Sequence, residues 1–119
     1  MRKGTKLVAA ALAATGVTLA IAPAQAGTTK KKVVEVGDYY FTPAKLTVRK
    51  NTIVVWRWPE SGGDAHDVVL KKGPRGIKKF ASEVFLADET YRKRLTVRGR
   101  YSILCSLHPE EMRQTITVK

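Results

Sequence analysis

From residue 33 onward, hydrophobic and polar residues alternate in short runs separated by turn residues. A period of two is typical of half-buried β-strands, and no stretch of 27–119 has the 3.6-residue period of a helix. The clearest run is 53–58, in which Val54, Trp56 and Trp58 are predicted to face the core. The pattern predicts strands at 33–36, 41–48, 53–58, 68–70, 82–86, 90–97, 101–105 and 112–118. Seven or eight short strands favour an all-β sandwich.

The breaks between these runs contain residues that suit turns. Asn51 is expected to adopt a positive φ, because asparagine is the best substitute for glycine there. Pro59 ends the run before it, and Gly99 turns the chain before 101–105. The stretch 71–79 contains two glycines and a proline and is therefore too broken to form a helix.

Residues 1–26 have the pattern of a secretory signal peptide. Three basic residues precede an apolar run over 7–22, and Ala24-Gln25-Ala26 matches an A-x-A cleavage site. The alternative is a retained membrane anchor, but the run is shorter than the roughly 20 residues that a spanning helix needs. We therefore expect residues 27–119 to form one domain that is secreted, periplasmic or otherwise extracytoplasmic, without stable membrane insertion.

The chain is strongly basic, with 22 Lys and Arg residues against ten Asp and Glu. Such a charge favours acidic partners, anionic envelope polymers or nucleic acid. Nucleic acid is not expected, because no face interleaves aromatic and basic residues. A basic run over 71–79 could steer an acidic partner at low salt, but such a run is more often a solvated loop. Its members are Lys71, Lys72, Arg75, Lys78 and Lys79.

The candidate chemistry is concentrated near the C-terminus, where 105–112 reads Cys-Ser-Leu-His-Pro-Glu-Glu-Met. Beyond residue 26, the chain has one cysteine, two histidines and one methionine, and only His66 lies outside this stretch. A lone cysteine in an exported domain cannot form an internal disulfide. It is therefore buried and inert, paired between chains, or chemically employed.

One thiolate, two imidazoles and one thioether are the ligand set of a mononuclear blue-copper site. The spacing Cys-x₂-His-x₃-Met allows a single loop to fold around one metal ion. Zinc is the other metal to consider, but four-coordinate zinc sites seldom use methionine. The remaining alternative is a core thiol, a core thioether and two surface imidazoles, with no metal.

Several motifs outside this loop resemble one protein family. They are Phe41-x-Pro43-x-x-Leu46-x-Val48, Val54-x-Trp56, His66 before an apolar strand, and Gly99-x-Tyr101-x-x-x-Cys105. Together with 105–112 they resemble the cupredoxins, the plastocyanin and azurin-like small blue-copper proteins. The Cys-x-x-His spacing is similar to that of plastocyanin, pseudoazurin and amicyanin rather than azurin.

The resemblance implies a Greek-key β-sandwich that binds one copper ion in a type 1 site through His66, Cys105, His108 and Met112. It implies a monomeric, non-enzymatic carrier of single electrons between redox partner proteins, with His108 as the electron's port. The alternative is copper storage, delivery or resistance without electron transfer. An enzyme would need an open or second metal site, for which no further histidine exists.

The sequence departs from the family pattern near the predicted site. Asp67 stands where the family usually has an asparagine that ties the two ligand loops together, and a carboxylate accepts hydrogen bonds but does not donate them. Three residues separate His108 from Met112, a spacing that is intermediate between those of amicyanin and plastocyanin. Glu110 and Glu111 place negative charge beside the expected port.

Overall fold

The computed structural model describes residues 29–61 and 63–119, which form eight β-strands. Their order along the chain is β1 (Lys31–Gly37), β2 (Tyr40–Thr42), β3 (Lys45–Val48), β4 (Ile53–Trp58), β5 (Val69–Lys72), β6 (Glu89–Arg94), β7 (Gly99–Leu104) and β8 (Arg113–Val118). No helix occurs among the described residues. The all-β prediction is therefore confirmed.

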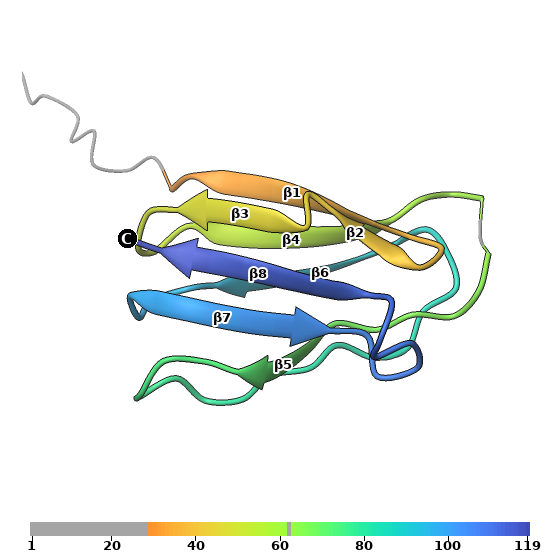
Figure 1. Ribbon diagram of the computed structural model, residues 1–119. Helices are drawn as coiled ribbons and strands as arrows, with labels where there is room; N and C mark the ends of the chain where they lie inside the picture. The colour runs from red at the N-terminus through yellow and green to blue at the C-terminus, as the bar shows by residue number, and fades with distance from the viewer. Residues whose placement is uncertain (1–28, 62) are drawn as a thin grey trace, which may run out of the picture.

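The strands form two four-stranded sheets, in the orders β2-β1-β4-β6 and β3-β8-β7-β5. Each sheet contains one parallel pair, β1 with β4 and β3 with β8, and its other pairs are antiparallel. The sheets pack face to face as a sandwich whose connecting loops gather at its two ends (Figure 1).

The core lies between the sheets and contains the residues expected from the period of two. Val54, Trp56 and Trp58 of β4 are all at most 2% exposed. Gln114 of β8 connects the layers, because it accepts a hydrogen bond from the Trp56 indole N–H (2.9 Å) and donates one to the carbonyl of Pro43 (2.8 Å). Its buried amide is thus satisfied at both ends.

The predicted strand over 41–48 is two strands in different sheets. Pro43 lies between them and has no N–H for a ladder hydrogen bond, so pairing stops there. β2 pairs with β1 and β3 pairs with β8. Asn51, in the turn that follows, has a φ of 75°, as expected.

The strand predicted over 82–86 is wrong. Among the described residues, this segment makes one isolated bridge, between Phe85 and His66, and Ala81 just before it makes another with Val69. Its apolar residues Val84 and Leu86 are 52% and 62% exposed, so the alternation does not correspond to a buried face. The segment instead fixes the backbone of His66, because Phe85 exchanges two hydrogen bonds with it.

The Tyr101 side chain stabilises the turn between β6 and β7. Its hydroxyl donates to the carbonyl of Val97 (2.6 Å) and accepts from the Val97 N–H (3.3 Å), while its ring is fully buried. We expect Tyr101→Phe to lower the free energy of unfolding by about 1–2 kcal/mol, because both backbone groups lose a partner. Urea denaturation measures this change.

The matched control for this variant is Tyr91→Phe. Tyr91 is half-buried against Trp56 and Phe80, and its hydroxyl has no hydrogen-bond partner within the described part of the chain. Its variant should unfold within about 0.5 kcal/mol of the parent. An equal loss in both variants would show that the Tyr101 hydroxyl bonds contribute nothing specific.

The predicted signal peptide, 1–26, lies outside the described residues. Within 29–61 and 63–119, no helix is long and apolar enough to cross a membrane.

Candidate metal centre

The predicted ligands come together at one end of the sandwich, the end at the right of Figure 1. Cys105 directly follows β7 and Met112 directly precedes β8, so the loop 105–112 connects two paired strands. The Cys105 N–H donates to the carbonyl of Met112 (3.1 Å), and the His108 N–H donates to that of Cys105 (3.2 Å). The loop backbone is therefore held before any metal binds.

The three-residue gap before Met112 corresponds to one closed turn. The Met112 N–H donates to the carbonyl of His108, four residues earlier, at 3.0 Å. This turn places the fully buried Met112 at the start of the return strand.

His66 comes from the long connection between β4 and β5. Its backbone exchanges two hydrogen bonds of 3.0 Å with Phe85, and its carbonyl accepts the indole N–H of Trp58 at 3.2 Å. Its side chain is 3% exposed. The segment that holds His66 in place therefore lies 39 residues before Cys105 in the sequence.

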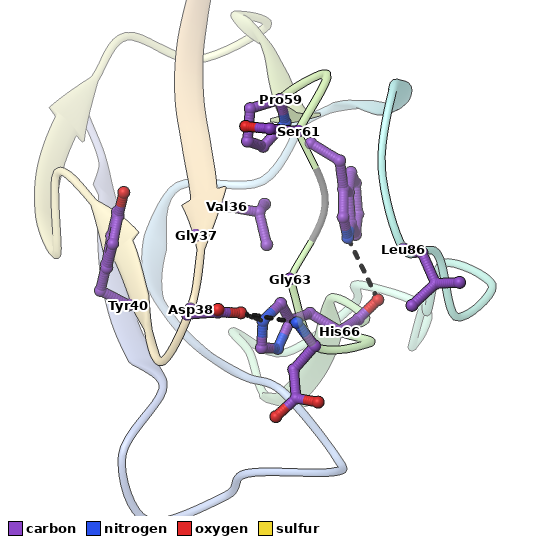
Figure 2. A pocket seen from close by; sticks show the side chains of 11 residues that line it. Val36, Gly37, Asp38, Tyr40, Pro59, Ser61, Gly63, His66 and Leu86 are labelled. Atoms are coloured by element: carbon purple, nitrogen blue, oxygen red, sulfur yellow. Dashed lines mark hydrogen bonds and ion pairs between the residues drawn. The ribbon is translucent and has the colours of Figure 1, made fainter.

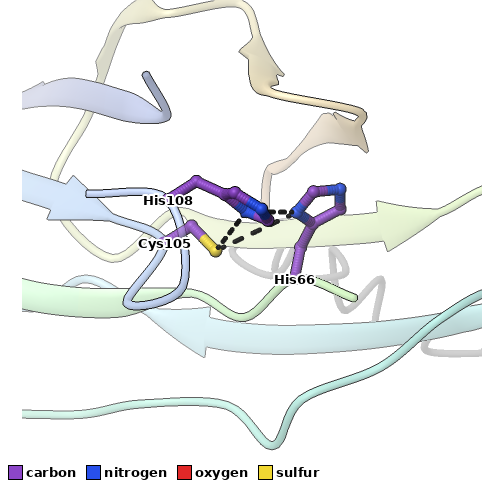
Figure 3. A group of neighbouring side chains, drawn as sticks. All are labelled: His66, Cys105 and His108. Carbon is purple, nitrogen blue, oxygen red and sulfur yellow. Dashed lines mark hydrogen bonds between the residues drawn. The ribbon is translucent and has the colours of Figure 1, made fainter. Parts of the chain in front are cut away.

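The donor atoms of His66, Cys105 and His108 form a compact triangle (Figure 3). The two Nδ1 atoms lie 3.2 Å apart, and Cys105 Sγ lies 3.9 Å from that of His66 and 3.7 Å from that of His108. A metal ion within the triangle, about 2.0 Å from nitrogen and 2.3 Å from sulfur, would separate these donors by about 3.5–3.7 Å. The three side chains therefore fit one metal ion without rearrangement.

Both imidazoles have a carboxylate on the side away from the triangle. His66 Nε2 lies 2.9 Å from Asp38 Oδ1, and His108 Nε2 lies 3.8 Å from Asp64 Oδ2. A carboxylate that accepts a hydrogen bond from Nε2–H, as Asp38 does at 2.9 Å, leaves the Nδ1 lone pair free to bind a metal. The hydrogen bond from the His66 ring is the main cause that lowers the pKa of Asp38. The carboxylate is therefore ionised and can accept this bond.

The Cys105 thiol is completely buried. Burial raises its pKa, and backbone hydrogen bonds from Asp67, Leu107 and His108 oppose that rise. These amides face the sulfur and would stabilise a thiolate, which is the form that binds metals.

Asp67 connects the loop of His66 to the loop of Cys105, although it is an aspartate where the family usually has an asparagine. Oδ1 accepts the Ser106 N–H at 2.7 Å, and Oδ2 accepts the Ser106 hydroxyl at 2.6 Å. Both donors come from the Ser106 side, so a carboxylate serves without having to donate. The tie lies next to Cys105 and fixes its loop against that of His66.

Sequence reasoning missed Asp38, Tyr39 and Asp64. The Tyr39 hydroxyl donates to Asp64 (2.5 Å), and its ring meets those of His108 and His66 edge-on, at centroid distances of 4.9 and 6.0 Å. This hydrogen bond, with the charges of Asp64, Asp38 and Glu111, raises the pKa of Tyr39. The only local signals were a polar turn after β1 and an acidic residue two places before His66.

A hollow of about 290 Å³ lies beside His66 (Figure 2). Asp38 and Asp64 line it together with Tyr40 and Leu86, which are 46% and 62% exposed. The outer edge of the metal centre therefore combines carboxylates with exposed apolar side chains.

Comparison with known proteins gives one family. Residues 28–119 match the sequence profile of the copper binding proteins of the plastocyanin/azurin family. No curated protein matches the chain in sequence.

Solved structures share the fold. Amicyanin from Paracoccus versutus is 26% identical, with a TM-score of 0.64 over 82% of this chain and 85% of its own. A pseudoazurin from Sinorhizobium meliloti is 22% identical, with a TM-score of 0.64 over 76% of this chain and 75% of its own. The Cu-containing nitrite reductase of Thermus scotoductus SA-01 is 26% identical over 74% of this chain, with a TM-score of 0.60, but the match spans only 22% of that enzyme.

Proposed function

Because this chain belongs to the plastocyanin/azurin family of copper-binding proteins, we propose that it carries single electrons between redox partners. Copper, cycling between Cu(I) and Cu(II), supplies the redox chemistry when it is bound. We propose His66, Cys105 and His108 as its equatorial ligands and Met112 as the weak axial ligand of a type 1 site.

The observation that carries the proposal is the closed, preformed donor triangle. His66 and Cys105 are buried, and their loop backbones are hydrogen-bonded. Met112 is also fully buried, and its carbonyl accepts a hydrogen bond from the Cys105 N–H. With Met112 as the fourth ligand, such a site would leave no open position for a substrate, which argues against catalysis. Within the described residues, no second group of three metal-binding side chains lies close enough together to form another site.

The proposed route for the electron is the His108 ring. Its side chain is 20% exposed, whereas that of His66 is only 3% exposed. His108 also follows Leu107, which is 49% exposed and adds apolar surface beside the ring. A partner that docks on this end would therefore come closest to the copper through His108.

The proposal is tested by adding Cu(II) to the purified, metal-free protein and recording the visible spectrum. We expect an intense thiolate-to-copper band that saturates at one equivalent, is bleached by ascorbate and returns on reoxidation. A colourless protein that binds zinc as well as copper would contradict the proposal.

A second measurement separates a carrier from a storage or delivery protein. A Cu(I) chelator is added in excess, and copper loss is compared with the rate of electron self-exchange. A carrier should exchange electrons much faster than it loses copper. Rapid loss with slow self-exchange would favour storage or delivery instead.

We also propose that 1–26 is removed on export and that the copper-binding domain begins at Gly27, outside the cytoplasm. The basic and apolar pattern of 1–26 supports this, as does the family match that starts at residue 28. The mass of the protein recovered from the producing cells gives the cleavage point.

Asp67→Asn is expected to raise the reduction potential of the copper-loaded protein. The change removes one negative charge beside Cys105, and that charge favours Cu(II) over Cu(I). At an effective dielectric constant of about 20, one charge several ångströms away corresponds to roughly 50–100 mV. Cyclic voltammetry measures the shift.

Asp88→Asn is the matched control for this prediction. Asp88 is an exposed residue just before β6. Its backbone N–H donates to the carbonyl of Pro59 (2.8 Å), a bond that the variant keeps, and its carboxylate makes no hydrogen bond or ion pair among the described residues. Its variant should shift the potential by less than about 20 mV, since solvent screens an exposed charge. Equal shifts would mean that Asp67 acts only through net charge.

A further inference from the structure

The charges of this protein are divided between its two ends. Four segments lie at the metal end: 38–39, 59–68 (of which residue 62 is not described), 83–88 and 105–112. These segments contain eight of the ten acidic residues of the chain and not one lysine or arginine. The eight are Asp38, Glu60, Asp64, Asp67, Glu83, Asp88, Glu110 and Glu111, of which only Asp67 is buried.

The opposite end has the reverse charge. Lys50 N–H donates to the carbonyl of Lys119, and Lys30 accepts from Ile53, so these three lysines lie together where β4 begins and β8 ends. Arg49 and Arg98 lie in the turns of the same end. Its loops, 49–52, 73–82 and 95–98, contain no acidic residue. The basic run of 71–79 starts on β5 and continues into one of these loops.

Screening separates the two ends electrostatically. A six-residue strand such as β8 is about 20 Å long, whereas the Debye length is about 10 Å at 0.1 M salt. A molecule that approaches the metal end is therefore affected mainly by the nearby carboxylates. The positive net charge of the whole chain acts weakly there.

Exposed apolar side chains lie among these carboxylates. Five of the six large hydrophobic residues that are strongly exposed belong to the metal end or its margin: Tyr39, Tyr40, Val84, Leu86 and Leu107. Tyr40 and Leu86 line the hollow beside His66 with Asp38 and Asp64 (Figure 2), and Tyr39 contacts the His108 ring. Apolar surface within a charged rim is the usual composition of a transient protein interface.

We propose that the metal end, defined by the four segments above, docks a redox protein whose own docking face is rich in lysine and arginine. The proposal rests on the proposed function and adds the chemistry of the partner to it. The net charge of the whole chain would instead favour an acidic partner. A basic docking partner and an acidic one therefore predict opposite effects of salt on the reaction rate with an ion of given charge.

The rate of oxidation of the Cu(I) protein by small complexes distinguishes these views. Tris(phenanthroline)cobalt(III), a trication, and hexacyanoferrate(III), a trianion, each accept one electron and leave the protein as Cu(II). As salt rises from 20 to 300 mM, we expect the rate with the trication to fall by about fivefold and the rate with the trianion to rise. The reverse pattern would overturn the proposal.

Two variants with the same change in charge locate the effect. Glu111 is exposed on the ligand loop, and Glu35 is on β1, where it pairs with Arg57 at 3.4 Å. Glu111→Gln should slow the trication about two- to threefold at 20 mM salt, whereas Glu35→Gln should have little effect. Equal effects would mean that net charge governs the reaction. Glu110 is less suitable, because Arg113 lies 3.6 Å from it.

A binding measurement needs no copper and so remains informative if the proposed function fails. A lysine-rich cytochrome c is added to the metal-free, ¹⁵N-labelled protein, and the same cytochrome with its lysines succinylated serves as the control. We expect amide shifts in the four segments with the native cytochrome at 20 mM salt, lost at 300 mM and absent with the succinylated form. Shifts at the lysine-rich end, or none, would overturn the proposal. Lack of colour with copper would instead refute only the electron-carrier function.

Discussion

Replacing Cys105 by serine is expected to abolish the intense visible band of the copper-loaded protein. The band arises from charge transfer from a thiolate to the Cu(II) that it binds. A serine hydroxyl is a harder donor and gives no comparable band. Copper affinity should fall by more than about 100-fold, since loss even of groups behind metal ligands costs 10- to 100-fold. Spectroscopic titration with Cu(II) measures both effects.

The Cys105→Ser protein must be shown to be folded, so that loss of the band can be assigned to loss of the thiolate. Serine is close in size to cysteine, but the site is fully buried, so the metal-free variant should be compared with the metal-free parent. Amide spectra that differ only around 66–67 and 105–112 would establish the same fold. A folded variant that keeps the intense band would exclude Cys105 as the ligand responsible for it.

Met112→Leu is expected to leave copper bound and to raise the reduction potential by on the order of 100 mV. Leucine has nearly the volume of methionine, so the buried position should remain filled. The lost thioether stabilises Cu(II) more than Cu(I), and its removal therefore favours reduction. Potentials measured by voltammetry, together with visible spectra, test this expectation.

Met112→Gln gives the opposite arm of the same experiment. Its amide oxygen is a harder donor than the thioether, so it should bind Cu(II) more strongly and lower the potential. Met112 is not the axial ligand if neither substitution changes the spectrum or the potential.

The contacts around the ligands explain why such a site can be rigid without metal. The loop 105–112 is closed by its own backbone hydrogen bonds, and Asp67 joins it to the loop of His66 through Ser106. Asp38 holds the His66 ring from the other side. A ligand set that does not move between oxidation states makes electron transfer easier, which is the task proposed here.

Much of the fold follows from local pattern. The alternation in 53–58 places Val54, Trp56 and Trp58 in the core, and the pattern predicts β4 with its observed bounds. The same reasoning failed at 82–86, because alternation describes a strand only where a neighbouring strand lies beside it. It also joined β2 to β3, since the apolar residues continue past Pro43 while the pairing partner changes from β1 to β8.

By itself, the sequence determined that one cysteine, two histidines and one methionine were available beyond residue 26, and that three of them lie within eight residues of chain. Short-range spacing is enough for that, because a hairpin loop brings nearby residues together whatever the rest of the fold. Only the tertiary structure decided what stands behind the ligands and around them. Asp38 reaches His66 across 28 residues of chain and Asp64 reaches His108 across 44, and four separate loops that carry carboxylates lie at one end. Such contacts depend on how two sheets pack, which no local pattern records.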